Sequence, residues 1–311
     1  MAVSRRIPPD HELTFRMFLT GFFIVVLYAI VVGLLFAFLH NIGLIIFIAV
    51  ALAFCQYWFS AKIALWGMHG HIVTAEQEPE LHGIVDRLCA LADMKKPQVA
   101  IAEVDMPNAF ATGRSPKHAV VCATRGIMRR LDEPELEAVL AHEISHVAHR
   151  DVAVMTIASF LGMIAGLLTR VMLYAGLFGG FGGGGGNRNN QSGSQVALIE
   201  MGVLVVSAVV YAISFLLTMA LSRYRELAAD RSGAILIGRP SLLASALVKV
   251  TGEMSRIPTR DLRSAEHFNA FYFSPAIANG ASLSSLFSTH PPLQKRLDAL
   301  AKLEAEMNQT P

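Results

Sequence analysis

The segment DEPELEAVLAHEISHVAHRD at 132–151 predicts a helix with two histidines on one face. Asp132 is a typical N-cap residue, Pro134 suits the first turn of a helix, and Glu135 lies three positions after the cap. Apolar residues then recur at helical spacing as far as the first histidine. We therefore expect a helix that begins next to Asp132 and extends through both histidines.

The run His-Glu-Ile-Ser-His at 142–146 has the spacing of a metal site. On a helix, His142 and His146 lie about 40° apart around the axis, so their two imidazoles can bind one tetrahedral zinc ion. Glu143 projects between them, where it can act as a general base for water, whose pKa zinc lowers toward about 7. The run predicts a metallopeptidase with one zinc ion per chain, although a surface helix with incidental histidines shows the same pattern.

A catalytic zinc ion needs a third protein ligand, and the candidates are His149, Glu226, Asp230, His267 and His290. His149 lies about one turn beyond the metal, and we interpret it as a polar surface residue. Glu226 is favoured if two helices are continuous. One would carry the histidines into the apolar run 152–169, and the other would extend from the run 201–221 through Glu226. Glu226 and the histidines then lie at similar distances beyond the ends of these two runs. Asp230, one turn later, would orient a ligand imidazole. A solvated helix with charge pairs is the competing interpretation of Glu226 and Asp230.

Composition and apolar runs indicate a membrane protein. Hydrophobic residues make up 53% of the 311 residues and charged residues 16%, against about 25% charged residues in a typical soluble domain. Uncharged apolar runs occupy 17–39, 42–61, 152–169 and 201–221, and about 20 residues suffice to cross a bilayer. We expect four transmembrane helices in two hairpins, with the glycine-rich segment 179–195 as an outer loop.

Charge and cysteine content exclude other classes. A net charge of +2 gives no support to a nucleic-acid partner. The three cysteines, Cys55, Cys89 and Cys122, are widely spaced, and they predict no disulfide framework.

Basic residues near the ends of the apolar runs set the expected orientation. They are Arg5, Arg6, Arg16, Lys62, Arg150, Arg223 and Arg225. The first connecting turn has no Lys or Arg, and the glycine-rich part of the second has Arg188 alone. We therefore expect the tail 1–16 and the segments 62–151 and 222–311 to face the cytoplasm, with hairpins at 17–61 and 152–221 in the lipid bilayer.

The segment between the hairpins predicts a small mixed domain. Residues 78–92 have helical spacing, and 98–104 and 118–123 are short β-type runs. The predicted fold class is thus a mainly α membrane protein, with four transmembrane helices and a cytoplasmic α+β zincin-like catalytic domain that carries a small sheet.

Four blocks in this order make the chain resemble the HtpX-type membrane zinc peptidases, in the wider family that includes the CAAX prenyl endopeptidases. They are PNAFATG at 107–113, LEAVLAHEISHVAHRD at 136–151, SRYRELAAD at 222–230 and STHPPLQKRL at 288–297. The resemblance implies that His142, His146 and Glu226 are the zinc ligands and that Glu143 is the general base.

The resemblance also implies roles outside the zinc ligands. Asn108, Ala109 and Phe110 fall in the edge-strand segment of the family, along which an extended peptide binds by strand addition. His290 and Arg296 fall in its late motif and would steady the oxyanion or the site, although a capped turn before a final helix explains them about as well.

The predicted function is hydrolysis of polypeptides, above all misfolded or damaged membrane proteins, by a membrane-integrated zinc endopeptidase. The resemblance implies a bacterial cytoplasmic membrane and a stress-related quality-control role. One alternative is a prenyl-protein (CAAX-type) endopeptidase, for which four spans are few. Another is a non-enzymatic metal-binding membrane protein, which the position of the histidines outside the apolar runs disfavours. The glycine-rich loop and the aromatic region 265–280 depart from the family pattern.

Overall fold

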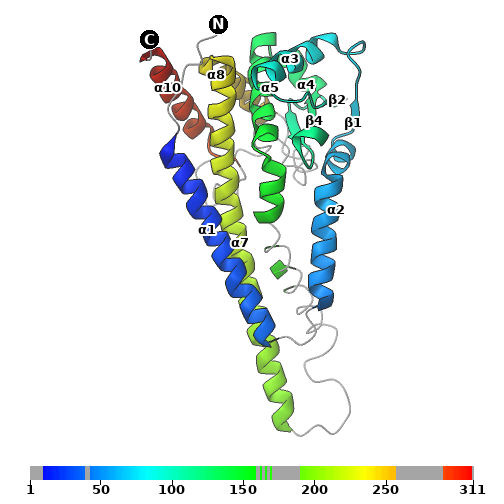
Figure 1. Ribbon diagram of the computed structural model, residues 1–311, viewed down its shortest axis with the longest axis vertical. Helices are drawn as coiled ribbons and strands as arrows, with labels where there is room; N and C mark the ends of the chain where they lie inside the picture. Colours follow the sequence, from blue (N-terminus) through cyan, green and yellow to red (C-terminus); the bar gives the residue numbers. More distant parts are fainter. Residues whose placement is uncertain are drawn as a thin grey trace. The chain divides into compact units, whose positions relative to one another are not determined.

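A computed structural model describes residues 10–38, 43–158, 162, 165–166, 169, 190–256 and 290–309 (Figure 1). The chain forms two compact units. The first unit comprises residues 1–18, 55–154 and 219–311. The second comprises residues 19–54 and 155–218.

A small mixed sheet lies in the first unit. Its strands are β1 (Gly70–Ile72), β2 (Gln98–Ala102), β3 (Ala109–Thr112) and β4 (Val120–Thr124), in the order β1-β2-β4-β3. β2 and β4 are parallel, whereas β3 pairs with β4 in antiparallel register, so β3 is an edge strand. The predicted β-type runs are confirmed as β2 and β4. β1 was not predicted, because three residues are too few to show an alternating pattern.

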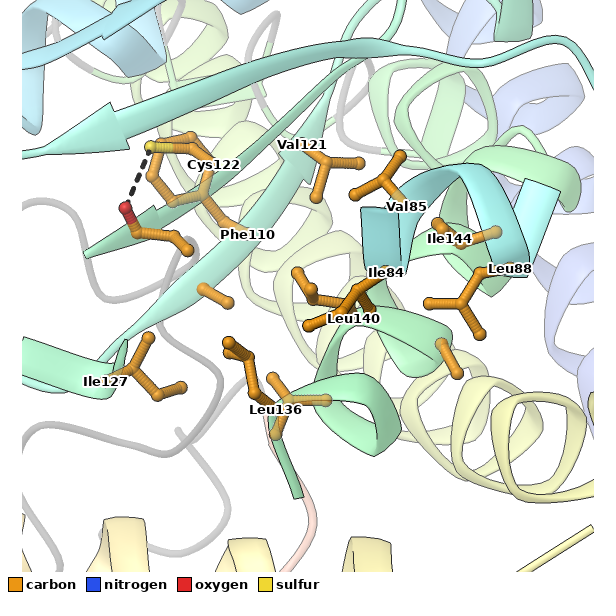
Figure 2. Packing of buried hydrophobic residues seen from close by; sticks show 14 of the residues in the cluster. Ile84, Val85, Leu88, Phe110, Val121, Cys122, Ile127, Leu136, Leu140 and Ile144 are labelled. Carbon is orange, nitrogen blue, oxygen red and sulfur yellow. Dashed lines mark hydrogen bonds between the residues drawn. The ribbon is translucent and has the colours of Figure 1, made fainter. Parts of the chain in front are cut away.

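Two helices pack an apolar face against this sheet. α3 (Pro79–Leu91) confirms the helix predicted over 78–92, and α5 (Glu133–Ala148) contacts α3, β3 and β4. Figure 2 shows Ile84, Val85 and Leu88 of α3 and Leu136, Leu140 and Ile144 of α5 in one buried cluster. Each such side chain contributes about 1.5–3 kcal/mol when fully buried. This packing fixes the rotation of α5, and therefore the direction of its two histidines.

The start of α5 is the predicted capping box. The Asp132 carboxylate accepts from the Glu135 backbone N–H at 3.0 Å, and the Glu135 carboxylate accepts from the Asp132 N–H at 3.2 Å. Glu135 also accepts from Ser245 and Lys249 of α8 (Pro240–Arg256) at 2.7 and 2.6 Å. α8 in turn contacts α10 (Leu293–Gln309). The short helix α4 (Arg125–Arg130) directly follows β4 in the chain.

Three long helices contain predicted membrane runs. α1 (His11–Phe38) contains most of the first run, α2 (Gly43–Gly67) contains most of the second, and α7 (Asn190–Ile237) contains the fourth. α7 has 48 residues and begins inside the predicted outer loop. In the third run, 152–169, residues 152–158, 162, 165–166 and 169 are helical, and the others lie outside the described residues.

One stretch qualifies as a bilayer span among the residues that the structure describes. It lies within Leu204–Ile237 of α7, which contains a window of residues long and apolar enough for one span. Many side chains of α1 and α2 are not described. The mainly α architecture with a small sheet is therefore confirmed, whereas the count of four spans stays a prediction.

Candidate metal centre

Helices α5 and α7 bring two histidines and one glutamate together. One donor atom each from His142, His146 and Glu226 lies within 4.8 Å of the others. The two Nε2 atoms are 3.1 Å apart, and Glu226 Oε1 and Oε2 lie 3.3 Å from His146 Nε2 and 3.7 Å from His142 Nε2. Ligands of a tetrahedral zinc ion at about 2.0–2.1 Å are about 3.3 Å apart. The three donors therefore have the spacing that one such ion requires.

His142 has a carboxylate behind its ring. Asp230 Oδ1 lies 2.9 Å from His142 Nδ1, and Arg296 binds both Asp230 oxygens, at 2.8 Å from Nε and 2.6 Å from Nη2. All three side chains are buried. A carboxylate at Nδ1 favours the proton on that nitrogen, which leaves the Nε2 lone pair available to a cation.

His146 has a carboxylate of its own, which the sequence did not reveal. Asp151 Oδ2 lies 2.5 Å from His146 Nδ1, and Asp151 also pairs with Arg225. The expected continuous helix is interrupted, since α5 ends at Ala148 and Arg150 has φ 58° before the next helix begins. On an unbroken helix, a residue five positions later lies about 140° away around the axis. No Gly or Pro marks the break, so the spacing gave no signal for Asp151.

The charge of the cluster suits a divalent cation. The carboxylates of Glu143, Asp151, Glu226 and Asp230 are buried, and two arginines accompany them. Buried charge without compensation costs several kcal/mol per ion. The two Nε2 atoms also lie only 3.1 Å apart, so a cation between them would be bound by both rings. Two imidazoles and one carboxylate are a donor set of catalytic zinc sites, so these residues fit the metal.

Glu143 lies beside the edge strand. Its Oε2 accepts the backbone N–H of Ala111 in β3 at 2.9 Å. Burial raises the pKa of Glu143 above its usual value, although the charges of His142 and His146 act in the opposite direction. A carboxylate whose pKa is shifted toward neutrality is suited to take up a proton and release it again.

The histidines and the glutamate shift one another's pKa values. Burial opposes the ionised form of Glu226, but the charge of His290 and hydrogen bonds with His142, His146 and His290 hold its pKa well below the usual range. Burial alone would lower the pKa of both ring systems, yet the carboxylates of Asp230 and Glu226 raise that of His142, and Glu226 raises that of His146. In the metal-free protein the cluster therefore attracts positive charge.

The late-motif residues reach the same cluster. His290 Nδ1 lies 2.9 Å from Glu226 Oε2, and Arg296 Nη1 lies 4.0 Å from that oxygen. His290 contacts the donor Glu226, and Arg296 binds Asp230 behind the donor His142, positions from which both can steady the site. Arg296 and Asp230 are 66 residues apart in the chain, so sequence spacing alone gave no sign of their pairing.

The remaining candidates are the residues predicted for the substrate edge strand and the other candidates for the third ligand. Ala109 and Phe110 lie in β3, whereas buried Asn108 precedes the strand and donates its N–H to Thr124 Oγ1 at 2.9 Å. His149 is exposed at the end of α5 and does not join the donor group. His267 lies outside the described residues.

Comparison with known proteins agrees with this geometry. The profile of peptidase family M48 matches residues 75–304. The chain is 55% identical over 309 residues to "Protease HtpX homolog 1" of Streptomyces coelicolor, covering 99% of this chain and 98% of that one. It is 50% identical to "Protease HtpX homolog" of Moorella thermoacetica, covering 99% of each. It is also 39% identical to the "Protease HtpX homolog" of Pyrococcus furiosus, covering 93% of this chain and 96% of that one.

A solved structure shares the fold. The crystal structure of S. mikatae Ste24p matches with a TM-score of 0.54 and 18% identity, covering 93% of this chain and 66% of that longer chain. The sequence relationships extend over almost the whole chain and include the helix of the two histidines. This chain therefore belongs to peptidase family M48 and is a membrane metalloprotease of the HtpX type.

Proposed function

We propose that the chain holds one zinc ion per molecule through His142, His146 and Glu226, with Glu143 as the general base. The observation that carries this proposal is the convergence of the three donors within 4.8 Å, next to a buried carboxylate on the same helix turn. A structural zinc site would need a fourth protein ligand, and among the described residues the donor group has three members.

The chain's own residues then divide the work of peptide hydrolysis. When bound, zinc supplies a Lewis acid that activates water and polarises the scissile carbonyl. Glu143 accepts the proton of the attacking water and delivers it to the leaving amine. Asp230 orients His142, while His290 and Arg296 hold the carboxylates of Glu226 and Asp230 in place. Stabilisation of the oxyanion is the other role open to His290 and Arg296.

The substrate is proposed to bind along β3. The Asn108 carbonyl accepts a hydrogen bond from the backbone N–H of Thr124 in β4. Backbone groups point alternately toward and away from the partner strand along an antiparallel pair. The backbone groups of Ala109 and Ala111 therefore face the open edge, as the contact of the Ala111 N–H with Glu143 illustrates. An extended polypeptide adding to this edge would pass directly beside the proposed base.

We infer the location of the protein from the distribution of basic residues along the chain and from its sequence relatives. Basic residues flank the ends of the apolar runs that precede and follow the catalytic segments, which favours four transmembrane helices with the active site on the cytoplasmic face. We infer a role in the cytoplasmic membrane of bacteria, on misfolded or damaged membrane proteins. An extended edge strand suits such substrates, because it binds unfolded chain through backbone bonds.

Substitution of the base tests the proposal. Glu143→Gln preserves the size of the side chain and the zinc ligands, so the purified protein should retain zinc and lose cleavage of an unfolded polypeptide by a factor of about 10²–10⁴. Glu137→Gln is the matched control on the same helix, since Glu137 pairs with Arg87 at 2.8 Å instead. It should cleave like the wild type.

The same assay separates the alternatives. Zinc binding by wild type without cleavage of any polypeptide would favour a non-enzymatic metal-binding protein. Cleavage confined to a prenylated peptide, with its unprenylated twin untouched, would favour a prenyl-protein endopeptidase. Wild-type rates in Glu143→Gln would remove the proposed base from the reaction.

A further inference from the structure

Asp151 and Arg225 form a pair next to His146, and the proposed function assigns no role to either residue. Asp151 Oδ2 lies 2.5 Å from His146 Nδ1, and the other oxygen pairs with Arg225 Nη2. Asp151 and Arg225 are only 8% and 6% exposed. We infer that Asp151 is a positioning residue that fixes the tautomer and ring orientation of His146, and that Arg225 holds Asp151 in place. This inference rests on the proposed zinc site.

The contact between Asp151 and His146 Nδ1 affects how His146 can bind a metal ion. A histidine that binds a metal through Nε2 carries its proton on Nδ1, and an acceptor at Nδ1 fixes both the proton and the ring plane. In this protein that acceptor is Asp151. If the ring of His146 turned, Nε2 would leave its place 3.3 Å from Glu226 Oε1 and 3.1 Å from His142 Nε2. The donor group therefore depends on Asp151 for one of its members.

The break after α5 is what brings Asp151 to the ring. Arg150 adopts φ 58°, and its carbonyl accepts the N–H groups of Ala153 and Val154 at 3.1 and 3.3 Å, so that a new helix starts at Asp151. The left-handed conformation is unfavourable for a non-glycine residue. α5 ends before this residue, and the Asp151 side chain lies beside His146 Nδ1 instead of continuing around α5.

Arg225 completes the arrangement from the other ligand helix. It precedes the ligand Glu226 on α7, and its guanidinium also lies 3.5 Å from the His149 carbonyl at the end of α5. A buried carboxylate without a counter-charge is strongly destabilising. Arg225 therefore supplies a counter-charge to the buried Asp151 and ties α7 to the helix junction.

Zinc binding by the full-length protein in detergent tests the inference directly. For Asp151→Asn we expect zinc affinity, measured by competition with a chelating dye, to fall about 10–100-fold. Asp151→Glu keeps the charge and should recover part of the loss. The matched control is Asp86→Asn, because Asp86 pairs with Lys96 at 2.8 Å with 59% of its side chain exposed, and it should bind zinc like the wild type.

A second arm tests the two supporting residues. Arg225→Gln should weaken zinc binding, and combining it with Asp151→Asn should add little, since both act through the same contact. Arg150→Gly suits a left-handed position and should keep wild-type affinity. Arg150→Val, a β-branched residue at positive φ, should lower affinity. Equal affinity in both Arg150 variants would refute the part assigned to the junction.

Unfolding of the metal-free protein separates positioning from a purely structural tie. If Asp151→Asn lowered the metal-free unfolding midpoint yet bound zinc with wild-type affinity, Asp151 would be structural only and the inference would be overturned. A wild-type protein that binds no zinc would instead overturn the proposed function, so the two failures are distinguishable.

Discussion

Gly233 sets how closely the two ligand helices approach. It is buried on α7, two turns after Glu226, and a Cβ atom at this position would lie 2.7 Å from the backbone N and 2.9 Å from the Cα of His142. Backbone atoms cannot give way as the end of a flexible side chain can. The absence of a side chain at Gly233 is therefore what allows Glu226 and Asp230 to reach the histidines on α5.

We expect Gly233→Ala to push α7 away from α5. Overpacking of this kind costs about 1–3 kcal/mol, and the shift should weaken zinc binding at least tenfold, as measured by dye competition and thermal unfolding. Gly83→Ala on α3 is the control, because a Cβ there meets no atom within 4 Å. It should raise stability by about 0.5–1 kcal/mol. Unchanged zinc affinity in Gly233→Ala would show that the helices accommodate the methyl group.

At the scale of elements, the charge of Glu135 supports the start of the helix that carries the histidines. Burial opposes the ionised form, but hydrogen bonds from Lys249, Ser245 and the Asp132 N–H hold the pKa of Glu135 below its usual value. A depressed folded-state pKa contributes stability that is fully present above the unfolded value, about 4.3, and is lost as pH falls through the folded value.

We therefore predict that Glu135→Gln lowers the free energy of unfolding by about 1–2 kcal/mol at pH 7. The difference from wild type should stay constant down to about pH 5 and shrink below about pH 4.3, as followed by thermal unfolding in detergent. Glu133→Gln, whose side chain is 67% exposed next to Arg87, should change stability by less than about 0.5 kcal/mol. A difference that persists unchanged at pH 3.5 would contradict the role of the Glu135 charge.

Elements with strong local signals were predictable from the sequence, whereas those created by distant contacts were not. The capping box at Asp132, the apolar face of α3 and the paired histidines are patterns within one or two helical turns. β1 was missed because its three residues depend on pairing with β2. The break at Arg150 was missed because arginine rarely adopts φ 58°, and its cost is met by contacts that no local pattern contains.

The candidate site shows the same division. The two histidines and Glu143 followed from spacing alone. Glu226 needed an argument about two helices side by side, and the continuity of α7 through residue 237 agrees with that argument. The assembly of Arg296 against Asp230 joins α10 to α7, and such long-range pairing leaves no trace in the spacing of either helix.

At the scale of the whole molecule, the orientation in the membrane decides which compartment supplies substrate. Basic residues flank the proposed cytoplasmic ends, while the segment 179–195 is glycine-rich and carries a single arginine. If the positive charges set the orientation, the catalytic segments and the glycine-rich segment lie on opposite sides of the bilayer. A cysteine placed in the catalytic segments and a cysteine placed in the glycine-rich segment should therefore differ in their reaction with a reagent that cannot cross the membrane.

Single cysteines placed at those positions test the orientation in intact cells. In a background with Cys55, Cys89 and Cys122 replaced by serine, Asn187→Cys in the glycine-rich segment should react with a membrane-impermeant maleimide. Lys117→Cys, at an exposed position near the sheet, should react only after the cells are permeabilised. Retained proteolysis by both variants would show that they are folded. Labelling of Lys117→Cys in intact cells would reverse the orientation, and the peptidase would then act on chains outside the cytoplasm.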